Sequence, residues 1–286
     1  MTYNLFTVDH LRPPLIRDVL AACTGVHVSE VDVADSEGDQ DDRNWDAAVL
    51  CDFTETLGSV ALSLDIDVQE WAPNQLSEKE LAAEFAAAAQ SAILYPAEES
   101  VPSAYWLVTP DRAVTRARLL SSDDARPVYS IEAVASKVAC LPGVPAAPLD
   151  EIVREYPTPV PLTDRFITTV ESSNAVGTPL YRARTALAEW ERMVRRMGSG
   201  WQPTGSCSAD MYQAGLRARD DIGQLVNELP QPAGDLLREL AEHIDGDFMK
   251  LTEQDDGRAL VEATGLVVGA HASAWWWKRR PSELPW

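Results

Sequence analysis

The chain has 286 residues, of which 45% are hydrophobic and 7% aromatic, and its formal net charge is -21. This length predicts two domains with hydrophobic cores, and the composition argues against a chain that is disordered throughout. The negative charge argues against bare nucleic acid and anionic lipid as partners, because both would be repelled.

The first predicted elements are a strand, a helix and a second strand. The segment "YNLFTV" (residues 3–8) is strand-like. Residues 11–24 follow a helical pattern, because Leu15, Ile16, Val19 and Leu20 would share one side. Next, "VHVSEVDV" (residues 26–33) alternates as a strand does.

Residues 45–68, "WDAAVLCDFTETLGSVALSLDIDV", predict a β-hairpin that turns near residues 55–58. Pairing Thr54 with Ser59 would give one apolar core face, made of Ala47, Val49, Cys51, Phe53, Val60, Leu62, Leu64 and Ile66. The same pairing places Asp52, Asp65 and Asp67 on the opposite, exposed face.

A capping box begins the next helix, because Ser77 is followed three residues later by Glu80, and this helix is expected to reach about residue 93. Three further strands are expected in "AYWLVT", "AVTRARLL" and "PVYSIEAV". Residues 1–140 therefore predict an acidic α+β domain, with a mainly antiparallel sheet and two helices against it.

A proline-rich linker is predicted at residues 141–164, which contain six prolines and one short helical turn at 149–155. Residues 165–286 predict a mainly α-helical domain, with helices at 181–197, 208–228 and 233–253. Residues 258–280 are either a fourth helix or a strand followed by a helix. The acidity belongs to the first half, since residues 1–157 hold 27 acidic and 10 basic residues, against 18 and 14 in the rest.

The chain ends in an aromatic and basic tail, "WWWKRRPSELPW". Three consecutive tryptophans cannot all face one side of a regular element. We expect this tail to dock on its own helices or on the first domain, with its bases meeting acidic residues.

The most unusual segment is "EVDVADSEGDQDDRNWD" (residues 30–46), which has eight carboxylates and one base, Arg43. It approximates an EF-hand calcium loop, but Gln40 replaces the required glycine and an aspartate replaces the final glutamate. The simplest interpretation is a solvated loop between strands. The alternative is a surface for a basic protein partner, made of Glu30, Asp35, Glu37, Asp39, Asp41, Asp42, Asp52, Asp65 and Asp67.

Other chemistry is not indicated by the sequence. The four cysteines are scattered and expected to be reduced, and the four histidines form no metal-binding pattern. There is no phosphate loop and no nucleophile elbow. We therefore expect no cofactor, no metal and no catalytic residue. The chain shows no secretory signal and no apolar run long enough for a membrane span, so a cytoplasmic protein is expected.

Four segments carry a resemblance to known proteins. "RNWDAAVLCDFTETLGSVALSLDIDV" and "PSAYWLVTPDRAVTRARL" resemble small uncharacterised proteins of actinobacteria. "LLRELAEHIDGDFMKLTEQDD" and the "WWWKRRP" ending are similar to a second group of short actinobacterial proteins. The resemblance implies the character of an immunity protein encoded beside a toxin, and it supplies no catalytic residues.

Three functions follow as hypotheses. The first is an acidic binding protein, most concretely an immunity protein or antitoxin that blocks the basic active site of a nuclease-like toxin. The second is a hydrolase or transferase with a metal held by the acidic cluster. The third is an adaptor or scaffold protein whose helical half mediates assembly.

The domain assignment makes a testable prediction. Limited proteolysis should cut first within residues 141–164 and leave two stable fragments, because prolines leave that backbone few regular hydrogen bonds. The fragments are identified by mass spectrometry. First cleavage inside residues 46–68, with the linker intact, would show that the boundary lies elsewhere.

Overall fold

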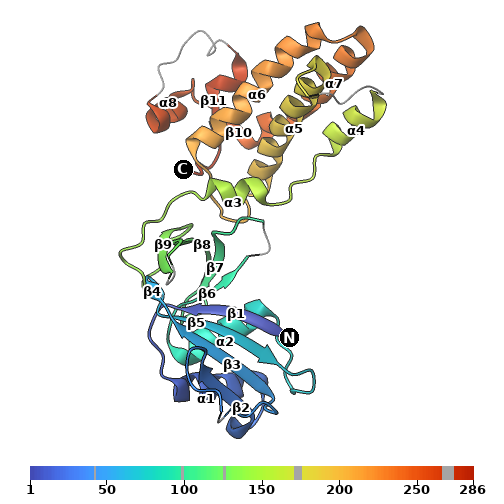
Figure 1. The fold of residues 1–286 in the computed structure, drawn as a ribbon. Coiled ribbons are helices and arrows are strands. Elements are labelled where there is room, and N and C mark those ends of the chain that lie inside the picture. Colours follow the sequence, from blue (N-terminus) through green and yellow to red (C-terminus); the bar gives the residue numbers. More distant parts are fainter. Residues whose placement is uncertain (42, 98–99, 125–126, 171–175, 266–273) are drawn as a thin grey trace. The chain divides into compact units, whose positions relative to one another are not determined.

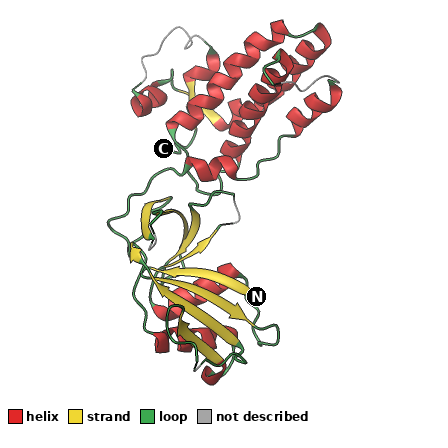
Figure 2. Ribbon diagram, in the orientation of Figure 1, coloured by secondary structure: helices red, strands yellow, loops and turns green. Residues whose placement is uncertain are grey.

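The computed structural model of the protein describes residues 1–286 except 42, 98–99, 125–126, 171–175 and 266–273 (Figure 1). The chain combines a large sheet with several helices, and it divides into two compact units, Met1–Leu149 and Asp150–Trp286. The sheet lies in the first unit and most of the helices lie in the second (Figure 2). We call these the first and second units.

The first unit contains a nine-stranded sheet with the strand order β2-β3-β5-β1-β6-β7-β8-β9-β4. Two neighbouring pairs are parallel, β2 with β3 and β4 with β9, and the other pairs are antiparallel. The sheet is therefore mixed. The strands are β1 (Thr2–Thr7), β2 (Val31–Asp35), β3 (Val49–Glu55), β4 (Leu57–Gly58), β5 (Leu62–Val68), β6 (Ile93–Pro96), β7 (Ala104–Val108), β8 (Val114–Ser121) and β9 (Val128–Val134).

Two helices pack on one face of this sheet. Helix α1 (Pro13–Thr24) has Pro13 in its first turn and ends at Gly25, whose left-handed conformation closes the helix. Helix α2 (Glu78–Ala89) begins with the predicted capping box of Ser77 and Glu80. Their apolar faces form the first core together with strands β1, β2, β3 and β5. A second core joins Phe6 and Val60 to side chains of strands β6 to β9.

Three details of the predicted first half are wrong. Residues 28–30 form a short 3-10 helix, η1 (Val28–Glu30), so the strand begins only at Val31. The helix predicted to reach residue 93 ends at Ala89, because Gln90 takes a left-handed conformation, and strand β6 follows. Val60 lies in the second core and not on the face that holds Leu64.

The predicted hairpin register is also wrong, by four residues. Thr54 pairs with Ser63 and not with Ser59, because residues 57–58 leave the hairpin to form β4 beside β9. Successive strand residues alternate between faces, so an even shift leaves the side chains within β3 and β5 on their predicted faces; Val60, which lies outside both strands, is the exception. Cys51, Leu64 and Ile66 accordingly lie in the first core, as expected.

The second unit is built around three long helices that pack on one another. These are α5 (Pro179–Gly198), α6 (Ala209–Glu228) and α7 (Gln231–Leu251), close to the three predicted helices. Their core includes the fully buried Trp190, Tyr212 and Phe248. The remaining elements are α3 (Asp150–Glu155), α4 (Pro161–Thr169), β10 (Thr252–Gln254), α8 (Arg258–Thr264), η3 (Trp275–Lys278) and β11 (Arg279–Pro281).

Part of the predicted linker is regular structure. Ala146 bridges to Val134 at the end of β9, and the short helical turn expected near residue 150 is helix α3. Helix α4 begins at Pro161, and its first free backbone N–H groups, those of Leu162 and Thr163, donate to the buried carboxylate of Glu191. The description of residues 141–164 as a separate linker stays a prediction.

The tail docks on the helices of its own unit, which was one of the two expected sites. The indole N–H groups of Trp276 and Trp277 both donate to the carboxylate of Asp220 on α6, at 2.9 Å each. Strand β11 pairs with β10, and Arg280 forms an ion pair with Glu253 at 2.9 Å. Arg280 therefore meets an acidic group, and Arg279 donates to the backbone carbonyls of Met249 and Thr252. For residues 258–280 the sequence left open a fourth helix or a strand followed by a helix. The described part of this range begins with helix α8 and ends with η3 and β11, and residues 266–273 lie outside the described chain.

Gly58 makes the close approach of β4 to β9 possible. Its φ is 102°, and a Cβ atom there would lie 2.0 Å from the carbonyl oxygen of Tyr129. We expect Gly58→Ala to lower the free energy of unfolding by about 1–3 kcal/mol, measured by urea titration of the full chain. Gly143→Ala is the control, because a Cβ there meets nothing within 4 Å, and it should change stability by no more than about 0.5 kcal/mol. Equal stability of the two variants would contradict the close approach.

Candidate partner-binding face

The acidic run is the connection between two parallel strands. Strands β2 and β3 are parallel neighbours, with Val33 opposite Cys51 and Ala34 opposite Asp52. A parallel pair needs a connection that returns to the start of the sheet across one of its faces, and this is usually a helix. Here residues 36–48 make that return, and the helix-covered face is already occupied by the first core. The connection therefore belongs to the opposite, outer face.

Arg43 joins this connection to the outer face of the sheet. Its guanidinium donates to Asp32 of β2 at 2.7 Å and makes a short hydrogen bond to Asp52 of β3. The Arg43 side chain is only 4% exposed, although it lies in a solvated loop. Burial lowers the pKa of Arg43, but its hydrogen bonds to the two carboxylates outweigh that effect, and the pKa is raised. The only base of the acidic run thus neutralises two acids of the sheet.

The outer face carries more carboxylates than Arg43 can neutralise. Asp52 lies directly opposite Asp65 of β5, and the next outward position of β5 is Asp67. Asp65 is exposed and has Asn4 of β1 on its other side. Asp67 accepts a hydrogen bond from Gln69 at 3.2 Å and lies 3.9 Å from the amino group of Met1. Like charges directly across a strand pair are destabilising, so this face favours a cationic group in contact with it.

The acids of the connection are held in tight turns. Asp35 accepts from the backbone N–H of Glu37 at 3.0 Å, and Asp39 accepts from that of Asp41 at 3.0 Å. Asp35, Glu37, Asp39 and Asp41 are all exposed. They form a second group of exposed carboxylates, at the end of β2 and in the connection that follows it.

One predicted site residue, Glu30, does not join this group. Glu30 accepts from the backbone N–H of His27 at 3.2 Å and so caps η1, at the opposite end of β2 from Asp35. Asp42 lies outside the described residues. We define the acidic face as Asp32, Asp35, Glu37, Asp39, Asp41, Asp52, Asp65 and Asp67.

The loop geometry differs from that of a calcium site. The side-chain amide of Gln40, at the position where the calcium loop requires glycine, donates to the backbone carbonyls of Asp35 and Gly38, at 2.8 and 3.0 Å, and so closes the loop by internal hydrogen bonds. Over the described part of the chain, no three His, Cys, Asp or Glu side chains are grouped so that they could hold a metal ion. The four cysteines are free; Cys140 is exposed, and burial raises the pKa of Cys23 to about 11.

Two exposed tryptophans lie near one end of the acidic face. Trp45 precedes β3 and Trp71 follows β5, and Val49 pairs with Val68 where these two strands meet. Trp45 is 61% exposed and Trp71 is 59% exposed. Trp45 also stacks on Arg43, with 4.6 Å between the guanidinium carbon and the ring centroid. Exposed aromatic side chains of this kind are enriched at protein interfaces.

Asp32 and Arg43 are the site residues that were missed from the sequence. Asp32 could have been found, because it alternates with Val31 and Val33 along the strand and must face outward. Arg43 carried no such signal, since its contacts depend on a parallel pairing that the local pattern does not reveal.

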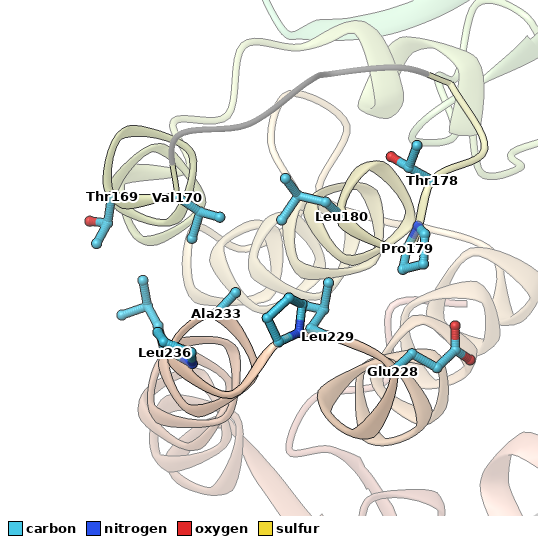
Figure 3. A pocket seen from close by; sticks show the side chains of 11 residues that line it. Thr169, Val170, Thr178, Pro179, Leu180, Glu228, Leu229, Ala233 and Leu236 are labelled. Carbon is cyan, nitrogen blue, oxygen red and sulfur yellow. The ribbon is translucent and has the colours of Figure 1, made fainter.

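The second unit contains a separate apolar groove of about 610 Å³. It lies at the ends of α4 and α6 and the beginnings of α5 and α7. Figure 3 shows Leu180 and Leu229 on one side of the groove and Thr169, Val170 and Leu236 on the other. The full lining is Thr169, Val170, Thr178, Pro179, Leu180, Glu228, Leu229, Pro230, Pro232, Ala233 and Leu236. Glu228 is already paired with Arg182 at 3.1 Å, so the groove offers apolar contact rather than chemistry.

Comparison with protein families, with curated proteins and with solved structures gives no match for this chain. The resemblance to actinobacterial immunity-like proteins therefore stays a prediction. None of the helices in the described residues is both long enough and apolar enough to cross a membrane.

Removing Arg43 should destabilise the first unit. Arg43→Met leaves Asp32 and Asp52 without their cation, and we expect the free energy of unfolding to fall by about 1–3 kcal/mol in a urea titration at low salt. The Asp52 side chain is 39% exposed, so solvent screens its interaction with Arg43 and limits the loss of stability.

The matched control is the triple variant Arg43→Met, Asp32→Asn, Asp52→Asn, which removes both sides of the interaction. It should recover part of the lost stability, because no charge is left unpaired. Unchanged stability of Arg43→Met alone would contradict the role of Arg43 in holding the connection to the sheet.

Proposed function

We propose that the protein is an acidic binding protein whose acidic face engages a basic protein partner. The observation that carries the proposal is the excess of carboxylates on the outer face, where Arg43 neutralises Asp52 but Asp65 and Asp67 of β5 lie beside it without an arginine or lysine of their own among the described residues. Such an excess of like charge is unfavourable in the free protein, and a cationic surface in contact with Asp65 and Asp67 would relieve the repulsion. Binding of a cationic surface is thus the activity that this geometry supports best.

The arrangement of charges favours an arginine-rich or lysine-rich surface over a single cation. The acids of the connection and those of β3 and β5 form two groups on one side of the sheet, separated by the buried Arg43. Trp45 and Trp71 supply exposed rings on which a partner's guanidinium could stack. Long-range attraction of this kind speeds association and selects against anionic partners.

The most concrete form of the proposal is an immunity protein or antitoxin in the cytoplasm. A nuclease-like toxin must attract phosphate, so its active site is basic, and a carboxylate-rich surface can cover that site. In this proposal the first unit is a mainly antiparallel α+β domain that carries the inhibitor surface, and the second is a separate helical domain.

The two other hypotheses have less support. A metal-assisted hydrolase or transferase would need metal ligands, and the described residues contain no group of three His, Cys, Asp or Glu side chains that could hold a metal ion. An adaptor function for the second unit is favoured by one observation, the apolar groove. We keep it as the second candidate function.

The proposal is tested by reversing exposed charges of the acidic face. The partner is captured on the immobilised full chain from a lysate of the source organism, identified, and produced separately. We expect the variant Asp39→Lys, Asp41→Lys, Asp65→Lys to associate with it about 10- to 100-fold more slowly in stopped-flow measurements at low salt. Its melting temperature should be unchanged or higher, because repulsion within the chain is reduced.

The control changes the charge by a similar amount at another place. Asp123→Lys, Asp124→Lys alters exposed acids between β8 and β9 and should slow association only slightly. High salt should reduce the difference between the parent and the triple variant. If the triple variant folds and binds as fast as the parent, the acidic face is only a solvated surface. If Leu236→Asp alone abolishes capture, the adaptor function is supported instead.

A further inference from the structure

Arg196 is a buried cation without a counter-ion. It lies in the last turns of α5 and is only 6% exposed. One guanidinium nitrogen donates to the backbone carbonyl of Arg154 at 2.9 Å, whereas the Nε–H group is buried and has no hydrogen-bond partner. Within the described residues, no carboxylate lies within ion-pair distance of it. A buried charge of this kind is strongly unfavourable unless an anion accompanies it.

The Arg196 guanidinium lines a small pocket inside the second unit. The pocket has a volume of about 40 Å³ and lies among α3, α5, α6 and the connection between α5 and α6. Its lining is Arg154, Glu189, Met193, Arg196, Trp201, Met211, Ala214 and Gly215. A cavity of about 10–15 Å³ accommodates one water molecule, so this pocket admits a few small atoms and excludes bulky anions.

The charges around the pocket leave a local excess of positive charge. Glu189 is the acidic residue of the lining, but its carboxylate already accepts a hydrogen bond from Arg192 at 2.8 Å. Arg154 lies 4.0 Å from Asp150, whose carboxylate is engaged by the backbone N–H of Ser208 at 2.9 Å. Two arginines therefore line the pocket, in a protein with a net charge of -21.

Burial lowers the pKa of Arg196, as expected for a cation that lacks a counter-ion. Desolvation lowers the pKa of this guanidinium, and the nearby Arg192 and Arg154 lower it further, against an opposite effect of Glu189. Arginine remains charged in proteins, so the group cannot relieve its burial by losing a proton. An anion bound next to the guanidinium would compensate its buried charge.

One wall of the pocket is held in an unusual backbone conformation. Trp201 has a φ of 58°, a left-handed value that bulky residues rarely adopt, and its N–H donates to the carbonyl of Arg196 at 2.7 Å. On the other side, Gly215 permits α6 to approach Met193, where a Cβ would lie 2.6 Å from that side chain. Both features keep the walls close to the guanidinium.

We propose that this pocket binds a small monovalent anion, of the size of chloride or of a single carboxylate group, with Arg196 as its principal ligand and Arg154 beside it. The anion would connect α3, the end of α5 and the middle of α6. It would stabilise the second unit independently of any partner bound to the acidic face. Larger anions such as phosphate would be excluded by the volume and by Met193, Trp201 and Met211.

The test uses sodium chloride and sodium formate as probes on the full chain. Sodium gluconate replaces them at constant ionic strength, because gluconate is too large for the pocket and screens charges equally. We expect chloride and formate to raise the unfolding midpoint of the second unit by about 2–5 °C with a saturable dependence. The parent should also broaden the ³⁵Cl NMR line of dissolved chloride.

Two variants address the site in different ways. Arg196→Met removes the cation, and Ala214→Phe fills the exposed rim of the pocket without touching a charge. Both should lose the saturable effect and the line broadening. Arg184→Met is the matched control, since it removes an arginine of the same helix that does not line the pocket and does not pair with Glu189, and it should retain both effects.

The variant Glu189→Gln tests whether the counter-ion of Arg196 is an anion from solution or the carboxylate of Glu189. In Glu189→Gln the anion should bind as tightly as in the parent or more tightly, because a like charge is removed from the lining. The proposal is overturned if gluconate reproduces the effect of chloride, or if Arg196→Met still broadens the line. It is equally overturned if anion dependence is absent in the parent and emerges only in Glu189→Gln, since Glu189 would then be the counter-ion.

Discussion

The interaction on which the first unit depends is the bridge from Arg43 to Asp32 and Asp52. Parallel neighbours β2 and β3 require the chain to cross the outer face of the sheet, and this crossing is made by residues 36–48 without a helix. A polar loop has no apolar face with which to hold itself against a sheet, so the bridge supplies the attachment. It also explains where the acids lie: Asp32 and Asp52 form ion pairs within the bridge, whereas the exposed acids are Asp35, Glu37, Asp39 and Asp41 before Arg43 and Asp65 on β5.

The separation of paired acids from exposed acids bears on the function of the acidic run. If all eight carboxylates of residues 30–46 were solvated alike, the run would be a loop with little consequence for binding. The bridge instead ties the connection that carries the exposed acids of the turns to the outer face of the sheet that carries Asp65 and Asp67. A surface that is preorganised in this way spends less conformational entropy on binding than a flexible acidic tail does. That is the physical reason to favour protein recognition over mere solubility.

The sequence was most informative where a single local pattern decides the outcome. Alternation placed Asp52, Asp65 and Asp67 on the outer face, although the predicted register between β3 and β5 was wrong by four residues. A shift by an even number of residues does not change the face on which a side chain lies. Helical periodicity located α5, α6 and α7 because each buries one continuous apolar stripe. Parallel pairing of β2 with β3, the departure of residues 57–58 to β9, and the bridge of Arg43 depend on partners distant in the chain. No local pattern contains them.

Buried arginines show how this protein ordinarily treats a cation removed from water. Arg43 has Asp32 and Asp52, and Arg219 has both carboxylate oxygens of Asp245, at 2.8 and 2.7 Å, together with the ring of Trp276. Asp245 in turn accepts from the indole of Trp190, so the pair is satisfied on every side and links the tail to the helical core. Arg196 is as deeply buried but has one carbonyl acceptor and an unpaired N–H beside a small pocket. Arg43 and Arg219 both have carboxylate partners, so the lack of one at Arg196 among the described residues favours an anion from solution as its counter-ion.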